Sequence, residues 1–200
     1  MSVLRLDPVA ADWDFPRSAT GLQVLLRFAE DAGVTPQRAL VGTGLRPADL
    51  LDPRGRGRGP GVGVRAAEVT AAQELRVVRT LHRLLGEVGA AVGERYEAAT
   101  FGAFGYALLA SRTVLDAMSF AVGFIDLSHA FALPTAEIAD GQVVVRLSGA
   151  KLPADVRRFL VERDVVAVHR VLEGLVPGGV GAVLTYAEAG ARLEFDADQL

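Results

Sequence analysis

The chain has 200 residues, a formal net charge of −3 and no cysteine, and half of its residues are hydrophobic. This length and composition predict one globular domain and exclude a disordered tail. Without cysteine, disulfides, thiolate metal sites and iron–sulfur clusters are excluded. The acidic balance argues against a domain that mainly faces phosphate. The low-charge runs at 101–110 and 117–125 are about half the length of a membrane-spanning helix, and the first residues show no secretory signal. We therefore expect a cytoplasmic protein with no membrane partner.

The first third of the chain predicts an arm, two short helices and a loop. Residues 1–19 show no hydrophobic periodicity, which indicates a partly ordered N-terminal arm. After it, apolar residues at helical spacing are interrupted by Gly33 and then by Thr35-Pro36, a pattern typical of a helix end and a new helix start. Residues 54–63 have glycine at every second position, and the first three glycines each follow an arginine, which predicts a flexible loop. The loose G-x-G-x-x-A pattern over 61–66 follows no strand, so we interpret it as part of that loop.

Three further helices are predicted in the middle of the chain. From Leu75 onward, leucines and valines recur at helical spacing on one face and arginines on the other, which predicts a helix over 67–86 that runs on towards Tyr96. The apolar run over 101–110 is expected to be a buried helix. Thr113 has a carboxylate three residues later, the spacing of a capping box, and predicts a helix over 113–128.

Strands are expected only in the last third. Alternating apolar residues at 135–139 and 142–147 flank Asp140-Gly141, a strong signal for a two-residue hairpin. Two more short strands are predicted at 180–186 and 192–195. The fold class is therefore α+β, with helix-rich N-terminal two thirds packed on a small, mostly antiparallel sheet, and residues 20–200 form the main domain.

A long helix is predicted from Pro153 to Val176. Val161, Val165 and Leu172 lie on one face, and Asp164 is expected among the charged residues of the other face. Because the chain is rich in apolar residues, we expect this helix to provide a surface for self-association.

The chemical motifs do not assemble a catalytic centre. His82, His129 and His169 lie on separate predicted elements without the spacing of a metal site. No nucleophile elbow or phosphate-binding lysine motif is present. Carboxylates are expected on solvent faces, where they cannot act as tuned acids or bases. We predict no enzyme activity, no cofactor and no metal.

Segments in a fixed order along the chain carry a resemblance. The sequence is similar to the N-terminal effector-binding domain of one branch of AraC-type transcriptional regulators, the branch whose domain is named an arabinose-binding domain. The matching segments are Leu25–Val34, Gly42–Leu50, Ala72–Arg79, Tyr96 with Phe101–Ser111, Ser111–Met118 and Leu152–Asp164.

The resemblance implies a domain that senses a small-molecule effector and forms a homodimer. In the family a separate C-terminal pair of helix-turn-helix units binds promoter DNA, and that part is absent from this sequence. This chain is therefore expected to reach DNA only through such a partner domain. The sequence departs from the family in the glycine-rich stretch at 54–63 and in a shortened segment at 186–192.

Aromatic and polar residues of the middle segment form the predicted effector site. The candidates are Tyr96, Phe101, Phe104, Tyr106, Phe120, Phe124, His129 and Phe131, with Arg146 of the hairpin. Lined by these residues, one cavity would favour a mostly apolar effector with one polar or anionic end, bound by His129, a tyrosine hydroxyl or Arg146. The same residues could instead form an ordinary aromatic core. Two other functions stay open, an effector-free dimerisation or protein-interaction module and a small enzyme with an unrecognised site.

Overall fold

The computed structural model describes residues 3–50, 68–187 and 189–200. The strands are β1 (Leu4–Leu6), β2 (Arg17–Ser18), β3 (Glu68–Val69), β4 (Pro134–Ala139), β5 (Gln142–Ser148), β6 (Val183–Ala187) and β7 (Gly190–Asp196). The helices are α1 (Ala19–Asp31), α2 (Pro36–Ala39), α3 (Pro47–Leu50), α4 (Ala71–Leu85), α5 (Gly89–Gly93), α6 (Ala103–Leu109), α7 (Val114–Gly123) and α8 (Arg157–Leu175). Three 3-10 turns are η1 (Ala98–Phe101), η2 (Ile125–Leu127) and η3 (Ala197–Gln199).

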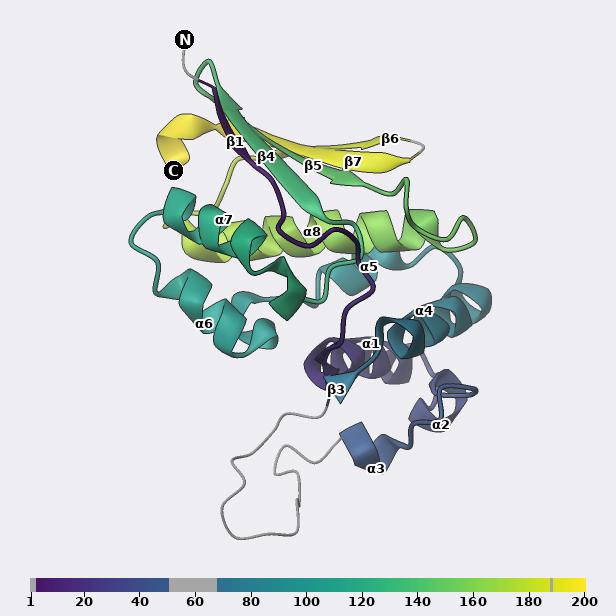
Figure 1. Cartoon of the computed structure of the whole chain (residues 1–200). Coiled ribbons are helices and arrows are strands. Elements are labelled where there is room, and N and C mark those ends of the chain that lie inside the picture. Colours follow the sequence, from purple (N-terminus) through teal and green to yellow (C-terminus); the bar gives the residue numbers. More distant parts are fainter. Residues whose placement is uncertain (1–2, 51–67, 188) are drawn as a thin grey trace, which may run out of the picture.

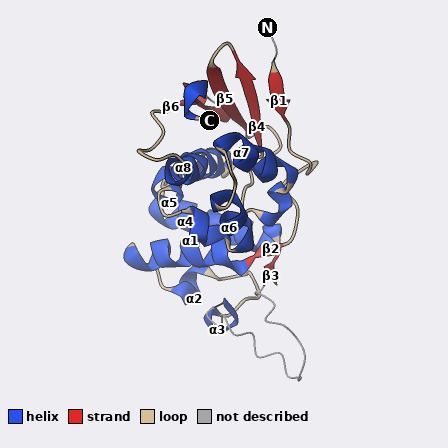
Figure 2. Ribbon diagram, turned by 90° about the vertical axis from the view of Figure 1, so that its left-hand side faces the viewer, coloured by secondary structure: helices blue, strands red, loops and turns tan. Residues whose placement is uncertain are grey.

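The elements form layers around α8. Figure 1 shows the sheet on one side of α8 and the helices α1, α4 and α5 on the other, while α6 and α7 lie near one end of α8. In the turned view of Figure 2 the strands of the main sheet again lie at one end of the molecule with the helices beneath them, and the short strands β2 and β3 lie among the helices. The predicted α+β class, with a helix-rich first two thirds and a small antiparallel sheet, is confirmed.

The main sheet has five strands in the order β1-β4-β5-β7-β6, and every neighbouring pair is antiparallel. The predicted hairpin is confirmed: Asp140 and Gly141 both have positive φ angles, 53° and 77°, as a tight two-residue turn requires. β1, which lies in the predicted arm, pairs with β4 at the edge of the sheet. β2, also within the arm, pairs with β3 in a separate two-stranded ribbon. The expectation that strands occur only in the last third was therefore wrong, because these strands of two or three residues are too short to show an alternating pattern.

The sheet has one buried and one solvent face because successive side chains of a strand point to opposite sides. Val143, Val145 and Leu147 of β5 are buried against the helices. Arg146 alternates with them, so it lies on the outer face, where its Nη1 is 3.4 Å from Glu137 Oε2. The sheet therefore contributes hydrocarbon to the interior and charge to solvent.

The long helix differs from its prediction in its start and its surroundings. α8 begins at Arg157 rather than Pro153 and ends before Pro177. It lies between the sheet and the other helices (Figure 1), so residues on several sides of it are buried. Asp164, expected on a polar face, is only 4% exposed. This burial also removes the broad exposed face on which we expected self-association to occur.

Glycines allow α5 to approach α8 closely. A Cβ added to Gly93 would lie 2.6 Å from the carbonyl oxygen of Arg163, and one added to Gly89 would overlap the backbone of Phe159. Close backbone approach of this kind fixes how deeply α8 is buried.

Glycines also divide two of the predicted helices. The helix expected over 67–86 is present as α4 and ends at Gly86, whose φ is 80°, so it does not run on to Tyr96. The segment at 101–110 is split at Gly102, with φ of 56°, into η1 and α6. The helix expected over 113–128 ends at Gly123, and η2 follows it.

The structure bears on two further predictions, the glycine-rich loop and the absence of a membrane-spanning helix. The glycine-rich stretch at 54–63 and the G-x-G-x-x-A pattern at 61–66 lie outside the described residues. Within the part of the chain that is described, the helices are too short or too polar to cross a membrane.

Candidate functional site

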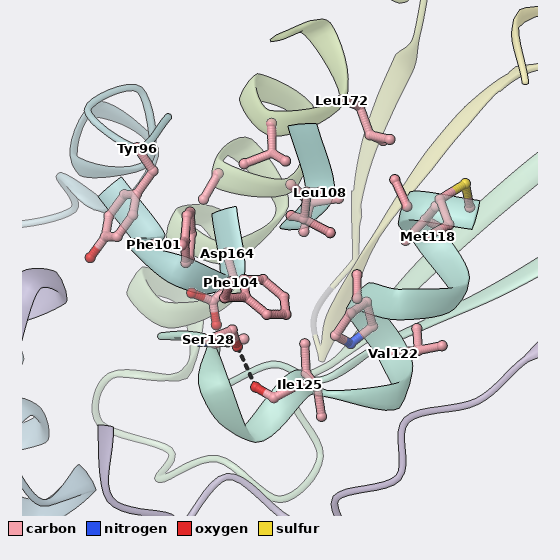
Figure 3. A pocket seen from close by; sticks show the side chains of 18 of the residues that line it. Tyr96, Phe101, Phe104, Leu108, Met118, Val122, Ile125, Ser128, Asp164 and Leu172 are labelled. Carbon is pink, nitrogen blue, oxygen red and sulfur yellow. Dashed lines mark hydrogen bonds between the residues drawn. The ribbon is translucent and has the colours of Figure 1, made fainter. Parts of the chain in front are cut away.

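A cavity of about 110 Å³ lies between α6, α7, α8 and the inner face of the sheet. Figure 3 shows its wall, with Phe104 and Leu108 of α6, Met118 and Val122 of α7 and Leu172 of α8. The rest of its apolar wall consists of Phe101, Ala117, Ala121, Ile125, Ala130, Pro134, Ala136, Val145, Ala167, Val168, Val171 and Leu175. The wall is therefore almost entirely hydrocarbon.

Small side chains leave this volume unfilled. Ala117 and Ala121 are one turn apart on α7, and Ala167 of α8 and Ala136 of β4 also line the cavity. Residues four apart share one helix face, so the two alanines of α7 leave one stretch of that helix without bulk. Each is surrounded by large apolar residues that cannot collapse completely into the gap.

One end of the cavity is polar and is built around Arg163. Its Nε donates to Asp164 Oδ1 at 2.7 Å, its Nη1 to Glu74 Oε1 at 2.8 Å and its Nη2 to the carbonyl oxygen of His129 at 2.8 Å. Arg163 is 1% exposed and Glu74 is fully buried. Burial alone disfavours a charged guanidinium, but the neighbouring carboxylates outweigh it and raise the pKa of Arg163.

A second buried arginine completes this group, which we call the buried ionic cluster: Arg17, Glu74, Arg163 and Asp164. Arg17 Nη1 lies 3.7 Å from Glu74 Oε2 and donates to the carbonyl oxygen of His129 at 3.2 Å. Asp164 Oδ2 accepts from the backbone N–H groups of Phe131 and Ala132, both at 2.7 Å. Burial raises the pKa of Asp164, whereas Arg163 and the two amide donors favour its ionised form.

His129 lies between the cluster and the aromatic wall. Its ring stacks on Phe101 with centroids 5.0 Å apart, and its Nε2 is 3.1 Å from Thr20 Oγ1. Burial, followed by the charges of Arg163 and Arg17, lowers the pKa of His129 from 6.5 to about 3, so the ring is neutral at pH 7. Among the described residues its Nδ1 has no hydrogen-bond partner.

The predicted site residues separate into two groups. Tyr96, Phe101, Phe104 and His129 line the cavity. The others do not line it: Phe120 packs against Phe104, with ring centroids 5.7 Å apart, and the remainder are Tyr106, Phe124, Phe131 and Arg146.

Each residue outside the cavity has a local reason for its position. Tyr106 is 67% exposed on the outer side of α6, and Phe124, 50% exposed, follows the end of α7 at Gly123. Phe131 is buried beneath two guanidinium groups, with Arg17 4.2 Å and Arg163 5.1 Å from its ring centroid. Arg146 lies on the outer face of the sheet, because strand alternation directs it away from Val145, which does line the cavity.

Sequence reasoning missed the buried ionic cluster and expected its carboxylates in solvent. A signal was present in α8: Arg163 and Asp164 each lie three or four residues from both Leu160 and Ala167. Residues with these spacings share a helix face, so the two charges belong to an apolar stripe. Glu74 likewise lies on the apolar face of α4 beside Leu75 and Val78.

Comparison with known proteins identifies the family. Residues 33–195 match the family described as the arabinose-binding domain, N-terminal, of AraC transcription regulators. Two relatives are uncharacterized HTH-type transcriptional regulators, Mb1430 of Mycobacterium bovis and Rv1395 of Mycobacterium tuberculosis. Each is 33% identical over 165 residues, which cover 80% of this chain and 44% of the relative. No solved structure matches the chain.

The chain thus spans less than half the length of these relatives, and the match extends over the cavity and most of the sheet. The elements that form the cavity, from η1 to β5 and α8, all lie within the matched residues. The chain belongs to the family of N-terminal arabinose-binding domains of AraC transcription regulators.

Proposed function

We propose that this chain is the ligand-sensing and dimerisation domain of an AraC-type transcriptional regulator, and that a small, mostly apolar effector binds in the cavity between α6, α7 and α8. The observation that carries the proposal is the cavity itself, a preformed hydrocarbon-lined space within the matched family domain. It lies at the junction of three helices and the sheet, where an occupant can contact several elements at once.

The wall favours an apolar ligand over a sugar. A sugar needs several hydrogen-bond donors and acceptors, whereas the side chains of α6, α7 and α8 around the cavity are hydrocarbon. The polar groups at its end are already joined to one another.

DNA contact is assigned to a helix-turn-helix domain outside this sequence, which agrees with the relatives' names and with this chain's net charge of −3. A regulator of this kind acts in the cytoplasm, where promoter DNA is located. We further propose a homodimer, which light scattering of the purified chain tests: a monomeric mass at tens of micromolar would contradict self-association of this domain.

Thermal unfolding with a panel of small molecules tests effector binding. A ligand at 100 times its Kd stabilises the folded state by about 2.7 kcal/mol, which corresponds to a rise in Tm of about 5–10 °C for a domain of this size. Ala167→Leu fills the cavity and should abolish the shift. Ala139→Leu, on β4 and away from the cavity, is the matched control and should keep it.

Failure of every panel member to raise the Tm would contradict effector binding and leave an effector-free interaction module. An unchanged shift in Ala167→Leu would place the ligand at another site.

A further inference from the structure

The charges at the polar end of the cavity are paired with one another. Each of the three guanidinium nitrogens of Arg163 donates a hydrogen bond to Asp164, Glu74 or the His129 carbonyl oxygen. Arg17 lies beside Glu74, so the cluster contains two positive and two negative charges. It therefore presents no net charge to a molecule in the cavity.

The two hydroxyl groups in the cavity wall are also engaged. Ser128 Oγ donates to the carbonyl oxygen of Ile125 at 2.6 Å and accepts from the N–H of Ala130 at 3.1 Å. The hydroxyl of Tyr96 donates to the carbonyl oxygen of Gly21 at 3.4 Å. His129 contacts Thr20 through Nε2, and its Nδ1 lies close to Gly21, where a Cβ would be 2.8 Å from that nitrogen. Nδ1 has no hydrogen-bond partner among the described residues, but the ring is neutral at pH 7 and offers no counter-charge to an ion.

A charged ligand would therefore have to break an existing pair or remain unpaired in a hydrocarbon-lined space. Removing one partner from a buried ion pair leaves an uncompensated charge, and burying an isolated ionised group costs much more than burying an apolar one. Arg146, which we expected to meet an anionic end, lies on the opposite face of the sheet.

The volume limits the size of the occupant. An engineered apolar cavity of about 150 Å³ stays dry and accepts benzene. The cavity here, about 110 Å³, is somewhat smaller and has the flexible side chain of Met118 in its wall. A single ring or a branched alkyl group of similar volume fits this space with a modest adjustment.

We propose that this cavity selects an uncharged, hydrocarbon-like ligand of about one ring in size and excludes carboxylates and ammonium ions of the same shape. The inference rests on the proposed function, because it concerns the ligand of the same cavity. The four charges of the buried ionic cluster pair with one another, so a charged ligand would find no counter-ion in the cavity.

Benzene and two charged derivatives, benzoate and benzylammonium, test the exclusion of charge by calorimetric titration at pH 7. Nitrobenzene and ethylbenzene, which are uncharged and nearly equal in shape to the two ions, are the controls for size and should bind more tightly than the ions. The chain has two methionines, Met1 and Met118, so the methyl NMR spectrum of methionine-labelled protein contains one reporter on the cavity wall. Benzene is expected to shift the Met118 signal and leave Met1 unchanged. Benzoate and benzylammonium should bind at least about 100-fold more weakly, because their charge is desolvated without a partner.

The variants separate the possible failures. In Ala167→Leu the Met118 response to benzene should disappear, and in Ala139→Leu it should remain. Benzoate or benzylammonium binding as tightly as benzene, with the same loss in Ala167→Leu, would overturn the exclusion of charge while supporting a ligand site. Absence of a Met118 response to benzene would overturn the inference, and the wider thermal panel would then decide separately whether the proposed function stands.

Discussion

The substitution Glu74→Gln tests the buried ionic cluster while preserving the shape of the side chain. Glu74 Oε1 lies 2.8 Å from Arg163 Nη1, and Oε2 lies 3.7 Å from Arg17 Nη1. All three side chains are at most 2% exposed, so water cannot replace the lost charge. Breaking a buried ion pair by removing one partner costs about 3–5 kcal/mol, and we expect Glu74→Gln to lower the free energy of unfolding by that amount.

Urea denaturation followed by circular dichroism measures this loss, provided that the transition is two-state. Asp155→Asn is the matched control, because it makes the same carboxylate-to-amide change in a solvent-exposed ion pair. The side chain of Asp155 is 55% exposed and that of its partner Arg79 is 43% exposed. It should cost less than about 1 kcal/mol. A loss below about 1 kcal/mol for Glu74→Gln as well would refute the view that the cluster is dry and electrostatically closed.

Three further predictions concern single residues. The pKa of His129 falls from 6.5 in the unfolded chain to about 3 in the folded one, so the folded protein loses about 1.4 kcal/mol of stability per pH unit as the pH falls below 6.5. His129→Gln should therefore reduce the slope of the free energy of unfolding against pH, measured by urea denaturation between pH 6 and 5. Equal slopes for the variant and the wild type would contradict this. Phe104→Ala should cost about 3–5 kcal/mol and enlarge the cavity, whereas the half-exposed Phe124→Ala should cost about 1 kcal/mol or less and leave ligand affinity unchanged. Gly105→Ala should lower stability by more than about 2 kcal/mol in thermal unfolding, because its Cβ would overlap the carbonyl oxygen of Ala98; a wild-type Tm would show that η1 can move away.

Local patterns predicted the elements well because their signals are local. Asp140-Gly141 adopts the positive φ angles that a two-residue hairpin turn needs, and the side chain of Thr113 accepts from the N–H of Asp116 at the start of α7. The helix boundaries were less predictable. The stops at Gly86 and Gly102 depend on positive φ angles that tertiary contacts select among many glycines.

The site was only partly predictable, since a cavity depends on how elements pack. The aromatic residues that point inward from η1 and α6 were identified, but the break after Gly123 turns Phe124 outward. The alanines that leave the space open were not singled out, because a small side chain carries no sign of an empty volume beside it. The ionic cluster was missed because its long-range contacts form only on folding: Glu74 meets Arg163 and Arg17, and Asp164 accepts from the N–H groups of Phe131 and Ala132.

The central claim is that the space between α6, α7 and α8 is a ligand site, and a crystal structure of the chain with the strongest ligand of the thermal panel tests it most directly. The account predicts electron density for the ligand in contact with Phe104, Met118 and Leu172, with the pairing of Arg163 and Asp164 unchanged. An empty cavity with the ligand bound elsewhere, or a ligand that forms a salt bridge with Arg163, would contradict it.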